Sequence, residues 1–235
     1  MPLFLAERDP GAAEAMDDPD CDRRTLYNTY RQFRYVNAAL SRTRSVWRRW
    51  LEPAMRDRSR TYSLLDIGFG GGDIPLKLAE WAAKDGYKLQ ITGIDTDARA
   101  IEYVRGLRRP ENVIFRHAST TELVRNGERY DFVLSNHLLH HLTTDELAVL
   151  LREVVQLSRR QALMVDLQRS DIAYALFSVL TLPFFRGSYI RIDGLASLRR
   201  SYTFDELRRT APAEWSVQRL FPFRQVLRYS HERGR

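Results

Sequence analysis

Four glycines lie within five positions, directly after an apolar run at residues 62–67. They are Gly68, Gly70, Gly71 and Gly72, and a helical pattern of apolar residues follows them. Glycine suits such a place because a sharp turn needs unusual backbone angles and a close ligand leaves no room for a Cβ. A buried strand, a tight turn and a helix start predict a nucleotide-binding site, with an ordinary strand-to-helix turn as the structural alternative.

The spacing of the glycines indicates which ligand the loop would hold. A dinucleotide loop follows the pattern G-x-G-x-x-G, whereas Gly68, Gly70 and Gly72 alternate here and Asp73 comes next. An acid at the helix start would repel a pyrophosphate because both are negative. The same acid is compatible with the positive sulfonium and ammonium groups of S-adenosylmethionine. The loop therefore disfavours a hydride-transfer enzyme.

A second acid, Asp95, ends the next apolar run at residues 89–94. In a doubly wound sheet the ligand lies across the carboxyl ends of neighbouring strands, where an acid can accept both ribose hydroxyl protons. We predict this contact for Asp95. The alternative is a cap on the helix expected at residues 96–106, for which Asp97 is the better candidate.

Three of the five histidines, His137, His140 and His141, follow a strand pattern at residues 130–136. A neutral imidazole can take a phenolic proton in a transition state; filling a pocket wall or capping the next helix is the structural alternative. In a helix, His137 and His141 would project to one side, and His140 would be turned about 100° from His141. We therefore expect His140 and His141 to act as a pair with one functional member, with His137 nearer the cofactor.

Periodic apolar residues predict the elements that position these side chains. Two amphipathic helices, at residues 23–40 and 46–55, precede the glycine strand. Further strands are expected at 89–94, 113–118, 130–136, 162–167, 215–221 and 223–229, helices at 76–84, 96–106, 143–158, 171–182 and 203–209, and a polar loop at 186–194. This order predicts an α/β fold with a doubly wound seven-stranded sheet, a closing antiparallel hairpin and an N-terminal helical cap.

Asp66 with the alternating glycines, Asp95, the segment from Asn136 to Leu142 and the closing strands resemble, in this order, the class I S-adenosylmethionine-dependent methyltransferases. The small-molecule branch, which modifies quinones and polyketides, is the most similar. The resemblance implies a Rossmann-like sheet and S-adenosylmethionine as cofactor. It implies cofactor-binding residues as follows: Asp66, Gly68, Gly70, Gly72, Asp95, Thr96, Ala118, Ser119 and Asn136.

One position departs from this pattern. The family commonly has an acid beyond the third strand for the adenine amino group, and Ser119 stands there. Its hydroxyl, or the backbone at Ala118 and Ser119, would have to serve instead. For the acceptor, the resemblance implies Tyr30 and Phe33 of the helical cap, although packing onto the sheet is the alternative for these rings. Arg191 and Arg199 are candidate acceptor-orienting cations.

The chain divides into three parts by composition and pattern. Residues 1–22 hold seven acids against one arginine and show no periodicity, so we expect a mobile acidic tail. Residues 23–58 would form the helical cap, and residues 59–235 the methyltransferase domain. The longest apolar stretch, at 172–185, is too short to cross a bilayer, and no secretory signal is evident. A cytoplasmic enzyme is expected.

The net charge of +7 and the pI of 9.7 suggest nucleic acid as a partner. The arginines are spread through every segment, however, and the chain lacks the D/N-P-P-aromatic run of amino-directed nucleic-acid methyltransferases. A small-molecule acceptor is therefore favoured, with O-methylation of a phenolic or polyketide/quinone-type metabolite. A tRNA or rRNA methyltransferase and a non-catalytic nucleotide-binding module are the alternatives. No metal is expected, because Asn136 and Asp166 alone make a weak metal site, and the single Cys21 excludes a disulfide.

Overall fold

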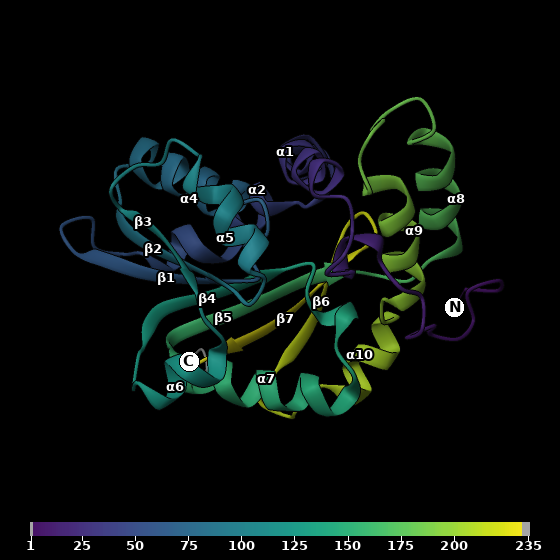
Figure 1. The fold of residues 1–235 in the computed structure, drawn as a ribbon. Coiled ribbons are helices and arrows are strands. Elements are labelled where there is room, and N and C mark those ends of the chain that lie inside the picture. Colours follow the sequence, from purple (N-terminus) through teal and green to yellow (C-terminus); the bar gives the residue numbers. More distant parts are fainter. Residues whose placement is uncertain (1, 232–235) are drawn as a thin grey trace.

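A seven-stranded sheet forms the centre of the computed structural model, which describes residues 2–231 (Figure 1). The strand order is β3-β2-β1-β4-β5-β7-β6. Strands β1 to β5 run parallel, and β7 pairs antiparallel with both β5 and β6. The bounds are β1 Thr61–Ile67, β2 Lys88–Asp95, β3 Val113–His117, β4 Tyr130–Asn136, β5 Ser158–Leu167, β6 Ser216–Leu220 and β7 Arg224–Ser230. The predicted fold, including the closing hairpin, is confirmed.

Helices cover both faces of this sheet (Figure 1). On one face, Leu64 of β1 belongs to the same buried cluster as Trp47 and Leu78. On the other face, Leu65 lies in a cluster with Leu151. Neighbouring residues of β1 thus point to opposite faces and are both fully buried, which explains why two leucines follow one another in this strand.

The helical cap consists of α1 (Arg23–Leu40) and a second helical segment with three parts, α2 (Thr43–Val46), the π-helical η2 (Trp47–Leu51) and α3 (Glu52–Ala54). The remaining helices are α4 Asp73–Lys84, α5 Ala98–Arg105, α6 Thr120–Arg125, α7 Thr144–Leu157, α8 Asp171–Leu180, α9 Ile190–Arg200 and α10 Phe204–Thr210, with short 3-10 turns η1 Ala15–Asp17 and η3 Leu139–His141. Asp97 caps α5 as predicted, and Thr203 opens α10 with a capping box. No helix within residues 2–231 has the length and hydropathy needed to cross a bilayer.

The polar loop predicted at 186–194 is partly wrong, because α9 already begins at Ile190. Asp193 and Gly194 are of residue types that are common in turns, but here both lie within α9. The Asp193 carboxylate accepts hydrogen bonds from the backbone of Ala15 and Met16, at 2.7 and 3.1 Å. Gly194 lies directly against the ring of Phe177 in α8, where a Cβ would overlap the ring. The glycine therefore permits close helix packing instead of a chain reversal.

Residues 2–22, expected as a mobile tail, lie against α8, α9 and η3, and we call them the N-terminal strap. Arg8 donates hydrogen bonds to the carbonyl oxygens of His140 and Leu142, at 2.9 and 2.8 Å. The Asp171 carboxylate accepts from backbone N–H groups at the start of the strap. These contacts use backbone groups and single side chains, which produce no periodic sequence signal. The division of the chain after residues 22 and 58 stays a prediction.

Candidate active site

The glycine loop joins β1 to α4 and packs against helix α1. Gly68, Gly70 and Gly72 have positive φ angles of 75°, 50° and 73°, a region that other residues adopt only with strain. A Cβ on Gly71 would lie 2.8 Å from the carbonyl oxygen of Tyr30 in α1. Part of the glycine requirement therefore comes from the helical cap, which the sequence did not reveal.

The strand register brings the predicted cofactor residues to one edge of the sheet. Ile67 of β1 pairs with Ile94 of β2 and with Ser135 of β4. The residues that follow each of these positions, Gly68, Asp95 and Asn136, therefore meet at the carboxyl edge. The side-chain oxygen of Asn136 is buried there without a hydrogen-bond partner, which leaves an acceptor available to a ligand.

The side chain of Asp95 is hydrogen-bonded to the backbone of the glycine loop. Its carboxylate accepts hydrogen bonds from the backbone N–H of Gly70 and of Asp97, both at 2.9 Å. Burial raises the pKa of Asp95 above its ordinary value, and the nearby Asp97 carboxylate adds to the rise. The carbonyl of the next residue, Thr96, lies 2.9 Å from Nε2 of His117. Asp95 thus fixes the shape of the loop at the position where the ribose contact was predicted.

Three carboxylates around the loop fit a positively charged ligand. Burial, followed by repulsion from Asp73 and Asp95, raises the pKa of Asp66 well above its usual range. Burial also raises the pKa of Asp73 to about 6, although Asn37 of α1 donates hydrogen bonds to it at 3.0 and 3.2 Å. A cation among these acids would favour their charged forms. The sulfonium and ammonium groups of S-adenosylmethionine have this charge.

The predicted adenine contact has less support from the geometry. The N–H of Ala118 donates to the carbonyl oxygen of Asp95 at 3.1 Å. Ser119 caps α6, and both its hydroxyl and its N–H lie in a capping box with Glu122. The groups that were expected to serve the adenine are therefore engaged within the protein. The cofactor roles of Ala118 and Ser119 stay predictions.

The four residues predicted for the acceptor lie in two places. Tyr30 and Phe33 of α1 both lie over the glycine loop, and each ring is 3.9 Å from where a Cβ of Gly70 would be. Arg191 instead donates to the carbonyl oxygen of Ser178 in α8, at 3.3 Å. Arg199 forms an ion pair with Asp9 of the strap, and its side chain is about half exposed. The structure therefore brings the two aromatic rings to the cofactor loop and engages the two arginines elsewhere.

His140 is the most buried of the three histidines, with an exposed fraction of 1%. Its Nδ1 lies 2.7 Å from Asp166 Oδ1, and its backbone N–H donates to Oδ2 of the same carboxylate at 2.7 Å. Burial alone would lower the pKa of His140, but Asp166 and then Glu14 outweigh it and raise the pKa to about 9. Burial alone would raise the pKa of Asp166, but His140 outweighs this effect and lowers the pKa to about 2. The neighbouring carboxylates therefore favour the protonated form of His140 when no other cation is bound.

His137 and His141 have different surroundings. Nε2 of His137 lies 2.6 Å from the guanidinium of Arg224, and burial together with that cation holds the pKa of His137 well below its ordinary value. His141 Nδ1 lies 3.1 Å from Asp17 of the strap, and a quarter of its side chain is exposed. Each predicted base is thus engaged with a neighbouring charged side chain.

The helical geometry expected for residues 137–141 is wrong. Only Leu139–His141 form a single 3-10 turn, and His137 precedes it with a positive φ of 61°. The rings of His140 and His141 lie 4.3 Å apart and are inclined by 35°. Both present Nε2 to Glu14 Oε1, at 3.4 and 3.7 Å. Adjacent histidines therefore do face one common point, and the strap supplies the group at that point.

Sequence reasoning missed several charged residues of this edge. Glu14 and Asp17 belong to a segment without periodicity, so no local signal marks them. Arg224 is 3% exposed at the start of β7, and burial lowers its pKa to about 10. An arginine directly before the apolar part of a strand pattern was a usable signal for a buried cation.

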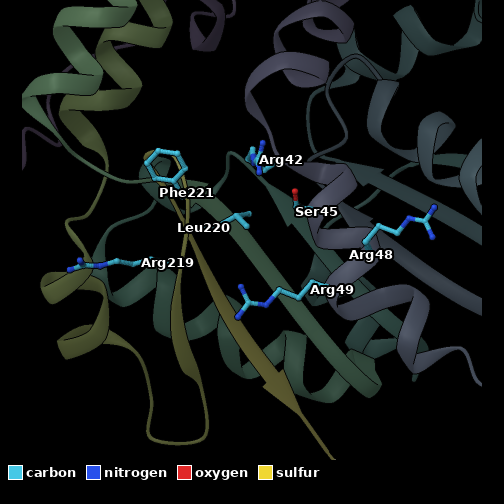
Figure 2. A pocket seen from close by; sticks show the side chains of 7 residues that line it. All are labelled: Arg42, Ser45, Arg48, Arg49, Arg219, Leu220 and Phe221. Carbon is cyan, nitrogen blue, oxygen red and sulfur yellow. The ribbon is translucent and has the colours of Figure 1, made fainter.

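An arginine-lined groove lies away from the glycine loop, between the second helical segment and the end of β6 (Figure 2). It has a volume of about 590 Å³ and is lined by Arg42, Ser45, Arg48, Arg49, Arg219, Leu220 and Phe221. None of the residues predicted for cofactor or acceptor lines it. Arg48 is already paired with Glu52 at 2.9 Å, so part of the positive charge is neutralised.

The fold is that of a doubly wound α/β enzyme, and the acids around the glycine loop suit a cationic nucleoside cofactor. Residues 64–161 match the family described as "Methyltransferase domain". This segment therefore contains a class I S-adenosylmethionine-dependent methyltransferase domain. No curated protein sequence matches the chain significantly.

Solved methyltransferases share this fold at low sequence identity. The plantazolicin methyltransferase BpumL, solved with S-adenosylhomocysteine, is 16% identical with a TM-score of 0.64, and the match covers 94% of each chain. Human N-acetylserotonin methyltransferase, solved with S-adenosylmethionine, is 13% identical with a TM-score of 0.57 over 89% of this chain and 56% of that one. The methyltransferase domain of bacterial CtHen1 is 16% identical with a TM-score of 0.54, covering 81% and 97%.

Proposed function

We propose that the enzyme methylates an oxygen of a small phenolic or polyketide/quinone-type acceptor. The observation that carries this proposal is that helix α1 and the N-terminal strap cover the carboxyl edge of the sheet. Helix α1 packs onto the glycine loop, and the strap binds η3 through Arg8. A covered site suits a compact acceptor better than a folded RNA, which needs an open and positively charged surface. A cytoplasmic location is part of the same proposal.

Catalysis would rest mainly on alignment and on the exclusion of water, because the sulfonium methyl group of the cofactor is already activated. The residues of the chain would hold the acceptor oxygen in line with that methyl group. A phenol has a pKa of about 10 and is mostly protonated at pH 7. The buried guanidinium of Arg224 would favour its ionised form. A histidine base stays a prediction, since His137, His140 and His141 are all engaged with charged neighbours.

Replacing Arg224 with Gln is expected to lower the methyl-transfer rate at pH 7 by about tenfold or more, and the loss should shrink as the pH approaches the pKa of the acceptor. The reason is that the variant loses the cation that favours the ionised acceptor. The rate is measured against pH, with cofactor affinity determined separately. Arg228→Gln, near the other end of β7, is the matched control. An unchanged pH profile in Arg224→Gln would exclude this electrostatic role.

The proposed function is tested by supplying methyl-labelled S-adenosylmethionine together with a panel of phenols, hydroxyquinones and their O-methylated counterparts as blocked controls. We expect label on free phenols and none on the blocked compounds. Bulk tRNA and rRNA are assayed in parallel at low and high salt. Strong, salt-sensitive incorporation into RNA without transfer to any phenol would overturn the proposal.

The arginine-lined groove is the specific observation that favours the second candidate, an RNA methyltransferase. Arg42, Arg49 and Arg219 line it together with Arg48, and arginine is well suited to phosphate contacts. If RNA is the acceptor, Arg49→Glu should reduce RNA methylation strongly and leave cofactor affinity unchanged. If a small phenol is the acceptor, the same variant should keep its full rate.

A further inference from the structure

The geometry of Glu14, His140 and His141 points to a divalent metal site, and we propose that these three side chains bind one Zn²⁺. Within the described residues, one ligand atom from each lies within 4.8 Å of the other two. The two histidines come from η3, and the glutamate comes from the N-terminal strap. This proposal departs from the sequence analysis, which expected no metal, and it does not depend on the identity of the acceptor.

The separations match those of a tetrahedral site. Nε2 of His140 lies 3.4 Å from Glu14 Oε1, and Nε2 of His141 lies 3.7 Å from the same oxygen. Ligands about 2.0–2.1 Å from a tetrahedral zinc ion are about 3.3 Å apart. The three groups are therefore almost in place before an ion is bound, and small side-chain rotations would close the site.

His140 provides an independent sign of a missing partner. Its Nε2 is buried without a hydrogen-bond partner, in a side chain that is only 1% exposed. Buried polar atoms are nearly always satisfied in folded proteins. The contact with Glu14 has the length of an ion pair but does not form a well-aligned hydrogen bond. A metal ion on Nε2, in place of a proton, would satisfy both groups.

The groups behind the two imidazoles are those found around metal-binding histidines. Asp166 Oδ1 lies 2.7 Å from Nδ1 of His140, and Asp17 Oδ2 lies 3.1 Å from Nδ1 of His141. A carboxylate on Nδ1 fixes the ring and keeps the lone pair of Nε2 directed at the metal. The hydroxyl of Ser197 donates to Glu14 Oε1 at 2.8 Å and orients the third ligand in the same way.

The ligand types select the metal. Two imidazoles with one carboxylate suit zinc and similar first-row ions, whereas magnesium and calcium prefer oxygen alone. Three protein ligands leave a fourth tetrahedral position for water or another ligand. Because Glu14 and Asp17 belong to the strap, a bound ion would also fasten the strap to the carboxyl edge of the sheet.

The test uses the full-length, tag-free protein, stripped with a chelator and then dialysed. Titration calorimetry with Zn²⁺ should show one site per chain, and Co²⁺ should give the visible absorption of a four-coordinate ion. His140→Ala, His141→Ala and Glu14→Gln should each weaken Zn²⁺ binding by at least about tenfold. Glu14→Gln is nearly isosteric, so it keeps the test valid if a histidine variant fails to fold.

His117→Ala is the matched control, because this exposed histidine lies on β3 and contacts the Thr96 carbonyl instead of the cluster. It should bind Zn²⁺ as tightly as the unmodified chain. The proposal is overturned if the stripped protein shows no saturable Zn²⁺ binding, or if Glu14→Gln binds the ion with unchanged affinity and gives the same Co²⁺ spectrum. Zinc binding is read without any acceptor, so its failure would leave the proposed function untouched.

Discussion

Asp95→Ala is expected to weaken the binding of S-adenosylhomocysteine by more than tenfold. Removing one partner of a buried hydrogen bond leaves the other unsatisfied and costs about 1–3 kcal/mol. This corresponds to roughly a 5- to 150-fold change in affinity. Two effects act together in this variant. The ribose hydroxyls would lose their predicted charged acceptor, and the N–H of Gly70 would lose the carboxylate that now holds it at 2.9 Å.

Titration calorimetry measures this loss, and circular dichroism shows whether the fold is retained. Asp97→Ala is the control, since Asp97 caps α5 and its carboxylate accepts from the backbone of Arg99 at 2.8 Å. That variant should lose about 1 kcal/mol of stability, as expected for a helix cap, and keep most of its affinity. If Asp95→Ala binds the cofactor product as the unmodified chain does, Asp95 serves only the backbone of the loop.

Asp166→Ala should destabilise the metal-stripped protein by about 3–5 kcal/mol, because it leaves the buried charge of His140 without its nearest partner. Urea unfolding in the presence of a chelator measures the change. The double variant Asp166→Ala with His140→Ala removes both charges and should lose less stability than the two single variants added together. Strictly additive losses would show that the two side chains do not interact.

The same pair sets how stability depends on pH. The pKa of His140 is raised to about 9 in the folded chain, compared with about 6.5 for an ordinary histidine. Its contribution to stability is therefore complete below about pH 6.5 and is lost as the pH rises through about 9. Asp166, with its pKa lowered to about 2, contributes above its ordinary pKa and loses this contribution as the pH falls toward 2. In Asp166→Ala, the free energy of unfolding should therefore decrease less as the pH rises toward about 9.

The features that the sequence predicted well depend on local patterns. The strand-to-helix loop at Gly68 and the acid at the end of β2 follow from short-range apolar periodicity and glycine placement. The cap at Asp97 and the capping box at Thr203 follow from side chains that bond to their own helix ends. Their position along the chain determines their partners, so no long-range contact has to be known.

The features that were missed depend on contacts between distant parts of the chain. Glu14 meets His140 across more than a hundred residues, and the acidic composition around it suggested a tail without structure. Asp193 and Gly194 form a turn signal by residue type, but their contacts with the strap and with Phe177 favour a helix. In both places, tertiary contacts outweighed the local preference that the sequence displays.

The strap has a practical consequence for handling this protein. Laboratories commonly trim an acidic, Pro- and Gly-containing N-terminus before crystallisation or assay, on the ground that it adds only disorder. Here such trimming would remove Glu14 and Asp17, and it would also remove the backbone groups of the strap that bind Arg169 and Asp171. A shortened enzyme that still bound its cofactor could then be inactive because of the trimming. Its inactivity would say nothing about the acceptor that was offered.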